Sequence, residues 1–196
     1  MKKILLWLLF SSINMGVFSQ KVKVIANEVD VSFPIDLRIV NKSLELINLV
    51  FNLPEFQDSI SKYSFVCTNK PILCKNNTIP GNSVYDDLIN AKEINIDLKV
   101  KALINPWRRF ISKTLGATNP SGHKIISYKW WLRKKKKDTK ELTIIYASHL
   151  GHEIFHTDYF KYLHNPEYGS SGFVNEKDVT YKIDDIIEAL IRKYYK

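Results

Sequence analysis

Long apolar segments and cysteines are both scarce in this chain of 196 residues. The unbroken hydrophobic run near the N-terminus covers residues 4–10, far fewer than the roughly 20 residues that a helix needs to cross a bilayer. The only two cysteines, Cys67 and Cys74, do not have the spacing of a zinc knuckle, so neither is expected to bind metal. Internal repeats and low-complexity tracts are also missing. What is left is a sequence typical of one globular domain.

Composition supports the same conclusion. Hydrophobic residues make up 45% of the chain and charged residues 25%, which is typical of a globular protein rather than a disordered or fibrous one. The length suffices for one domain with a substantial core and is too short for two comfortable ones. We therefore expect a single domain over residues 21–196.

The first twenty residues have the layout of a secretory signal peptide. Met1, Lys2 and Lys3 form a short basic segment, the apolar run follows, and residues 11–20 are more polar and rich in small residues. This pattern predicts export to a periplasm or the cell exterior; an uncleaved N-terminal membrane anchor is the alternative. No cysteine stands near the expected cleavage site, so a lipid anchor is not predicted. In an oxidising compartment, Cys67 and Cys74 can close a small disulfide loop.

The formal net charge of +9 favours anionic partners. An exported protein seldom meets nucleic acid, so nucleic acid is not the expected partner. The main basic run is interpreted as a solvated connection between two elements, with contact to an anionic surface or polymer as the alternative. That run consists of Arg133, Lys134, Lys135, Lys136 and Lys137.

Hydrophobic periodicity predicts an α+β domain with a small mixed sheet. Alternation of polar and apolar residues indicates strands at 21–26 and 94–100, and the apolar segment 123–132 is also strand-like. Spacings of three and four, together with capping residues and first-turn prolines, indicate helices at 43–51, 54–65, 83–91, 105–115, 139–163 and 183–195. The glycine-containing segment 116–122 is expected to form a loop.

One motif carries chemistry: residues 152–156 read H-E-x-x-H. On a helix, side chains four residues apart project from the same side, so His152 and His156 can reach one ion. Zn²⁺ accepts such nitrogens, and Glu153 lies where it can take a proton from the water that zinc activates. The alternative is that both histidines are ordinary core or surface residues. His149 shares their face; we expect it to pack nearby, with a supporting contact to the ligands or an unusual ligand role as alternatives.

With this motif in place, the chain resembles the zincin metallopeptidases over roughly residues 125–190. The order of strand 123–132, basic turn and H-E-x-x-H helix is similar to their active-site half, here about residues 94–196. The resemblance implies that His152 and His156 bind zinc, that Glu153 is the general base, and that a peptide pairs along a strand lining the cleft. The metzincin branch is excluded, because Tyr159 and Tyr162 stand where it has glycine and its third ligand.

The third zinc ligand has three candidates. Glu176 follows His152 by a spacing similar to that of thermolysin-like gluzincins. The segments 172–174 and 184–190 resemble a block in a family of bacterial zinc-binding metallopeptidases, which implies Asp184 as the ligand. Glu188, one turn further, is the third candidate. We prefer Asp184, although an aspartate there also suits the positive N-terminal end of the final helix.

The sequence thus predicts an exported zinc metallopeptidase that cleaves peptide or protein substrates. Tyr168 or Tyr181 can donate a hydrogen bond to the developing oxyanion. Two other functions stay open: a non-catalytic binding module with the same fold, and a basic exported protein that binds an anionic polymer.

Overall fold

The computed structural model describes residues 21–31, 34–66, 78–101, 116–128, 138–163 and 178–195. Several predictions fall outside these ranges and stay predictions. They are the signal peptide at 1–20, the cysteine pair, the helix at 105–115, the basic run at 133–137, Tyr168 and Glu176.

The described chain forms an α+β fold whose centre is a four-stranded mixed sheet in the order β1-β4-β6-β5. Three strands are parallel, and the short β5 pairs antiparallel with β6. A separate antiparallel pair, β2 and β3, lies away from this sheet. The bounds are Lys23–Asp30 for β1, Ser64–Val66 for β2, Thr78–Pro80 for β3, Glu93–Lys101 for β4, Gly116–Thr118 for β5 and Lys124–Tyr128 for β6.

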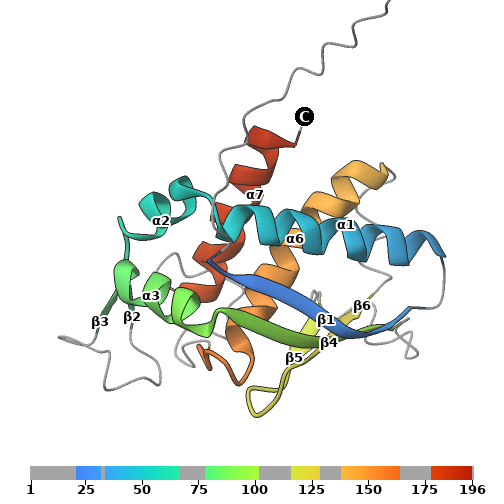
Figure 1. The fold of residues 1–196 in the computed structure, drawn as a ribbon, viewed down its shortest axis with the longest axis horizontal. Coiled ribbons are helices and arrows are strands. Elements are labelled where there is room, and N and C mark those ends of the chain that lie inside the picture. Colours follow the sequence, from blue (N-terminus) through green and yellow to red (C-terminus); the bar gives the residue numbers. More distant parts are fainter. Residues whose placement is uncertain are drawn as a thin grey trace, which may run out of the picture.

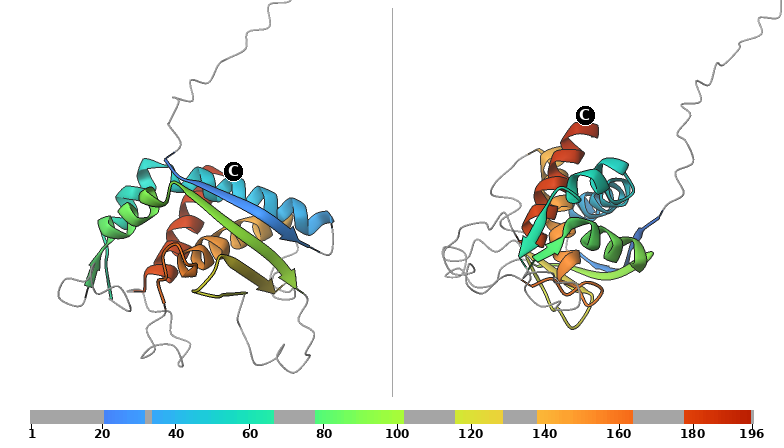
Figure 2. Two further views of the ribbon diagram at one scale, coloured as in Figure 1. Left: turned by 60° about the horizontal axis from the view of Figure 1, so that its bottom comes forward. Right: turned by 90° about the vertical axis from the view of Figure 1, so that its left-hand side faces the viewer.

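Helices cover one side of the sheet, as Figures 1 and 2 show from three directions. Helix α1 runs across β1, while α6 passes over β5 and β6 and packs against both α1 and α7. The bounds are Pro34–Phe51 for α1, Pro54–Ile60 for α2, Gly81–Ala91 for α3, Thr139–His156 for α6 and Val179–Tyr194 for α7. None of the described helices is both long enough and apolar enough to cross a membrane.

The core lies between the sheet and these helices. Strand β4 shows how the sequence creates it, because Ile94, Ile96, Leu98 and Val100 are buried while their polar neighbours are partly exposed. Successive strand residues point to opposite faces, so this alternation places one apolar row under the helices. Burying such a side chain contributes about 1.5–3 kcal/mol relative to leaving it exposed.

Two asparagines, Asn48 in α1 and Asn52 directly after it, occupy the outer edge of β1. The backbone N–H of Lys23 donates to the carbonyl of Lys92, on the β4 side, so the backbone groups of Val22 and Val24 face outward. The side chain of Asn48 accepts from the N–H of Val24 at 2.7 Å and donates to its carbonyl at 3.0 Å. Asn52 makes the equivalent pair of bonds with Val22. This part of the edge is therefore closed to another strand.

The positions of the strands were predicted more accurately than the ends of the helices. The strand predictions at 21–26 and 94–100 are confirmed by β1 and β4, and the predicted strand 123–132 contains β6, which lies inside the sheet. The loop predicted at 116–122 is wrong at its start, because residues 116–118 pair with β6 as β5. The helix predicted over 54–65 ends at Ile60, since residues 64–66 pair with β3.

Helix starts and stops also differ from prediction. The helix predicted at 43–51 begins nine residues earlier, at Pro34. Helix α3 begins at Gly81 and has no side-chain cap, so Ser83 is not its N-cap. Helix α7 begins at Val179, where Asp178 caps it by accepting the N–H of Thr180.

The helix predicted to reach residue 163 ends at His156. Thr157 adopts an extended conformation there, and its hydroxyl donates to the carbonyl of Ile154 at 2.6 Å. Lys161 then has a positive φ of 56°, which lets the chain turn back. As a result, the N–H of Tyr162 donates to the carbonyl of Phe155.

Candidate metal centre

Helix α6 carries the H-E-x-x-H motif and is buried over most of its length. Asp138 caps its start by accepting the N–H of Lys140. From Thr143 onward nearly every side chain is buried, which is typical of a helix enclosed on all sides. His152, Glu153 and His156 are only 6–8% exposed. Three polar side chains at this depth need defined partners.

The two histidines converge on one point. Their Nε2 atoms lie 3.2 Å apart, and their ring centroids are 4.9 Å apart. Two nitrogens bound to one tetrahedral Zn²⁺ at about 2.0–2.1 Å lie about 3.3–3.4 Å from each other. The spacing of His152 and His156 therefore fits two ligands of a single zinc ion without rearrangement.

A backbone carbonyl sets the tautomer of His156. The Nδ1 atom of this ring is in short hydrogen-bonding contact with the carbonyl oxygen of Tyr162. A carbonyl can only accept, so Nδ1 carries the proton and the Nε2 lone pair faces His152. The side chain of Tyr162 is itself anchored, because its hydroxyl donates to Asp87 of α3 at 2.9 Å. This is the kind of outer contact that orients metal-binding histidines.

Glu153 lies between two polar neighbours on different elements. The hydroxyl of Thr118, on β5, donates to Oε2 of Glu153 at 2.7 Å. The Nδ1 atom of His149 lies 3.7 Å from the other carboxylate oxygen, Oε1. The glutamate is thus contacted by the end strand of the sheet on one side and by its own helix on the other.

His149 belongs to a buried polar chain that leads away from Glu153. The hydroxyl of Tyr146 donates to Oγ of Ser127 at 3.1 Å, and that Oγ lies 3.3 Å from Nε2 of His149. Burial, with a smaller contribution from nearby His156, lowers the pKa of His149 to about 3. The ring is therefore neutral at pH 7. A carboxylate can only accept, so the tautomer that suits both neighbours has the proton on Nδ1, facing Glu153, and the lone pair of Nε2 facing the Ser127 hydroxyl.

A glycine makes room for this ring. A Cβ atom on Gly116 would lie 2.5 Å from Nε2 of His149 and 2.6 Å from the carbonyl oxygen of Ile126. No real Cβ contact is that short, so any larger residue on β5 at this position would displace His149.

Asp184, the preferred third ligand, lies on the side of α7 that faces α6. Its carboxylate is bonded to Ser148, one turn before His152 on α6, and its Oδ1 atom is buried without a hydrogen-bond partner among the described residues. Burial, and then the nearby Asp185 and Glu188, raise its pKa to about 6. In the described part of the chain, no group of three His, Cys, Asp or Glu residues is arranged to hold a metal ion. Asp184 as third ligand stays a prediction.

The packing of α7 against α6 explains this placement. Residues later in α7 contact residues earlier in α6. Arg192 pairs with Glu141, Asp184 contacts Ser148, and the ring of Tyr181 packs on His152. The two helices are therefore antiparallel.

In this register, Asp178 at the start of α7 comes nearest to the level of His156 among the described residues of this part of the chain. Glu188 lies further from the pair still, and it forms a salt bridge with Arg192 at 2.7 Å.

Of the two tyrosines predicted to assist the oxyanion, Tyr181 is described, and its ring packs on the motif. Its ring centroid lies 4.9 Å from that of His152, with the planes inclined at 67°. Burial raises its pKa, and the negative charges of Asp178, Glu153 and Asp184 raise it further. Tyr181 therefore keeps its proton at neutral pH and can act as a hydrogen-bond donor.

The polar partners of the motif were not identified from the sequence. Thr118 lies in a segment predicted as a loop, and Ser127 in a strand where it reads as an ordinary inward residue. The carbonyl of Tyr162 has no sequence signal, since every residue has one. A pattern search could at most have marked Ser127 as a polar residue in an apolar strand.

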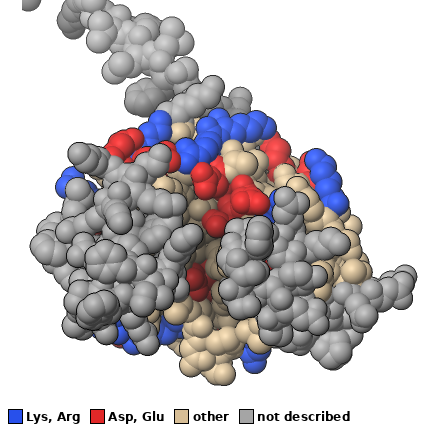
Figure 3. Space-filling model, turned by 180° about the vertical axis from the view of Figure 1, so that it is seen from behind, with Lys and Arg blue, Asp and Glu red and all other residues tan. Residues whose placement is uncertain are grey.

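Charge is unevenly distributed over one face of the molecule. Seen from behind, acidic side chains gather near the middle of the surface (Figure 3), although the net charge of the chain is +9.

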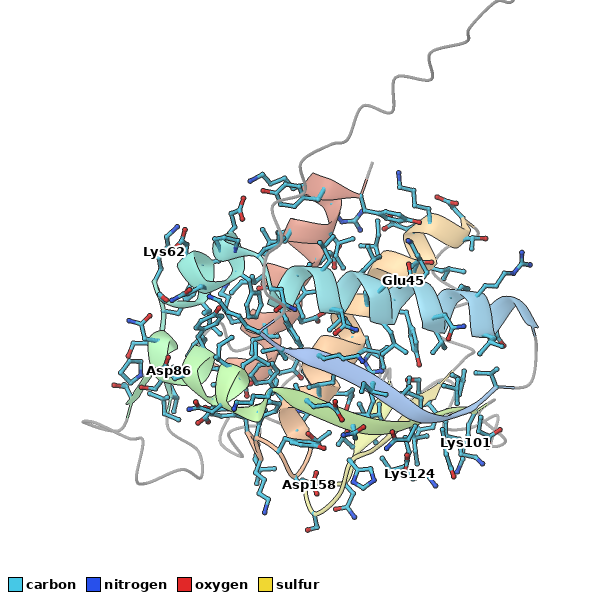
Figure 4. The ribbon with its side chains drawn as sticks, viewed as in Figure 1. Glu45, Lys62, Asp86, Lys101, Lys124 and Asp158 are labelled. Atoms are coloured by element: carbon cyan, nitrogen blue, oxygen red, sulfur yellow. The ribbon has the colours of Figure 1, made fainter. Side chains whose placement is uncertain are left out.

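Beneath the end of α6, the turn labelled by Asp158 in Figure 4 is tied to the β5–β6 connection, because the N–H of Asp158 donates to the carbonyl of Gly122. This bond holds the end of α6 against the connection that follows β5, the strand that carries Thr118.

Comparison of the chain with protein-family models, with curated proteins and with solved structures found no match in any of the three.

Proposed function

We propose that this protein is a zinc-dependent hydrolase, most simply a metallopeptidase, exported as its sequence predicts. The observation that supports this best is the 3.2 Å separation of the Nε2 atoms of His152 and His156. Glu153, which lies between them in the sequence, is also buried. Two converging imidazoles, of which His156 has its tautomer fixed by a carbonyl, fit a zinc ion, and an adjacent carboxylate fits a general base.

In this proposal, His152 and His156 hold the ion. When bound, zinc supplies Lewis-acid chemistry that lowers the pKa of a water molecule toward 7 and polarises a substrate carbonyl. Glu153 accepts the proton of the attacking water and passes it to the leaving amine, so that the peptide bond is replaced by an acid and an amine. Tyr181, protonated and packed on His152, donates a hydrogen bond toward the oxyanion.

The sheet supports a peptide as substrate. One end of the described strand order is β1, whose outer backbone groups at Val22 and Val24 are occupied by asparagines. The other end is β5, which carries Thr118 next to Glu153. An extended peptide that added to β5 would run past the general base, and strand addition is a common way to bind extended peptides.

The test combines metal analysis with cleavage. Purified protein is expected to hold about one zinc per chain. Glu153→Gln should retain that zinc while turnover of a peptide library falls about 10²- to 10⁴-fold, because the general base is lost and the ligands are not. His152→Ala is the matched control, and it should lose both zinc and turnover. Wild-type protein that binds no zinc, or a Glu153→Gln variant with full turnover, would contradict the proposal.

A second function is favoured by one observation: no third His, Cys, Asp or Glu among the described residues joins the histidine pair. In this case the protein is a non-catalytic binding module with a buried histidine pair. It would fold fully after treatment with a chelator and cleave no member of the library, whereas the hydrolase would lose turnover with its zinc and regain it when zinc is returned.

A further inference from the structure

The general base in the proposed function has a carboxylate that can rotate, so something must fix its orientation. A carboxylate has two oxygens and about four lone-pair sites, and only one orientation directs the right lone pair to the attacking water. Glu153 touches described polar groups through both oxygens, and those groups come from different elements.

On the first oxygen, the contact is a short hydrogen bond. Thr118 Oγ1 lies 2.7 Å from Oε2 of Glu153, a distance typical of a hydroxyl donating to a carboxylate. Thr118 is half-buried on β5, and its backbone is held opposite Ile125 of β6. The donor therefore comes from a strand of the sheet and not from α6, the helix that carries Glu153.

On the second oxygen, the contact is the imidazole of His149. At 3.7 Å the Nδ1–Oε1 distance is too long for a hydrogen bond, yet the N–H dipole faces the negative charge. The ring cannot turn away, because Ser127 engages Nε2 and Tyr146 engages Ser127. The chain Tyr146–Ser127–His149 has its donors aligned toward the carboxylate, and all three residues are at most 3% exposed.

We propose that Thr118 and His149 are positioning residues that hold the Glu153 carboxylate from two sides. Thr118 sets the orientation through its hydrogen bond, and His149 prevents rotation toward the interior. The same contact links the general base to β5, so that a peptide lying along β5 and the base that acts on it share one rigid support. The catalytic role in this inference rests on the proposed function, whereas the contact between Thr118 and Glu153 is independent of it.

The first arm of the test needs no metal and no activity. Unfolding of the chelator-treated protein is measured for wild type, Thr118→Val, Glu153→Met and the double variant. Thr118→Val removes the hydroxyl and keeps the shape, and Glu153→Met removes the carboxylate and keeps its length. We expect Thr118→Val to raise the unfolding constant about tenfold in the wild-type background and less than about twofold when Glu153 is replaced by methionine. Equal effects in both backgrounds would overturn the inference.

The second arm uses the zinc-loaded protein. Thr118→Val should lower kcat about tenfold or more, with KM and zinc content unchanged, whereas Thr118→Ser should restore kcat to within about threefold of wild type. Equal kcat for the Val and Ser variants would overturn the positioning role. If wild type itself shows no turnover, the proposed function fails, and the unfolding arm alone decides whether Thr118 holds Glu153.

Discussion

Replacing Asp184 by asparagine is expected to stabilise the metal-free protein at neutral pH. The carboxylate packs against Ser148, and its Oδ1 atom is buried without a partner in the described part of the chain. An ionised carboxylate in such a place costs free energy, because water has been removed and no described donor replaces it on that oxygen. An asparagine side chain at this position would have nearly the same shape without the charge.

The magnitude follows from the pKa of Asp184, which rises from 3.8 to about 6 on folding, chiefly through burial. At about 1.4 kcal/mol for each unit of pKa, this rise corresponds to about 3 kcal/mol. The folded state binds the proton more tightly, so this contribution to stability is complete below pH 3.8 and is lost as the pH rises through 6. Above pH 6 wild type should therefore be less stable than Asp184→Asn by up to about 3 kcal/mol, and near pH 4 by little.

Urea unfolding of the chelator-treated protein at a series of pH values measures this difference. Asp185→Asn is the matched control, because Asp185 is the next residue and its side chain is exposed. It should leave the stability nearly unchanged at every pH. An Asp184→Asn variant that is less stable than wild type at pH 7, or whose advantage does not depend on pH, would refute the reasoning.

The same variant decides a ligand question. If Asp184 moves to the metal when zinc binds, Asp184→Asn should lose zinc despite its greater stability without metal. Retained zinc would leave Glu176 and Glu188 as the predicted candidates for the third ligand. Zinc content and stability are measured on the same variant to separate the two roles. Loss of a ligand lowers the affinity for zinc, whereas removal of a buried charge raises the free energy of unfolding.

Two further predictions concern packing. Gly151→Ala should lower the free energy of unfolding by about 1–3 kcal/mol, because its Cβ would overlap Cδ1 of Ile187, whereas Gly122→Ala, whose Cβ meets nothing within 4 Å, should have little effect; urea titrations compare the two. Asn52→Ala should cost about 1–3 kcal/mol and increase self-association, because it removes the two hydrogen bonds that Asn52 makes with the backbone of Val22 beside β1. Light scattering against concentration measures the association, and an unchanged, monomeric variant would contradict this role.

The parts of the fold that could be predicted are those that depend on local periodicity. The alternation over residues 94–100 identifies β4 because each inward residue is aliphatic, and the spacing of His152 and His156 places both on one face of α6. Strand β5 could not be predicted, since three residues that include a glycine carry no period of their own. It exists because β6 offers them a partner.

The end of α6 was missed for a similar reason. Apolar residues continue past His156, so the pattern alone extends the helix to residue 163. The stop comes from Thr157, whose hydroxyl takes the carbonyl of Ile154, and from the positive φ of Lys161. Only after this turn can the carbonyl of Tyr162 meet His156. The contact that orients His156 therefore depends on the same turn that the prediction missed.

The candidate site also depends on the N-terminal half of the chain, from which the sequence suggested no contribution. Asp87 of α3 holds the hydroxyl of Tyr162, whose carbonyl fixes the tautomer of His156. Ser43 of α1 donates to the carbonyl of Thr143, which ties α6 to a helix 100 residues earlier. A metal-binding pair needs its rings fixed to within a fraction of an ångström, and two ligands four residues apart on one helix cannot supply that themselves. The motif provides the donor atoms, and contacts distant in sequence give them one orientation.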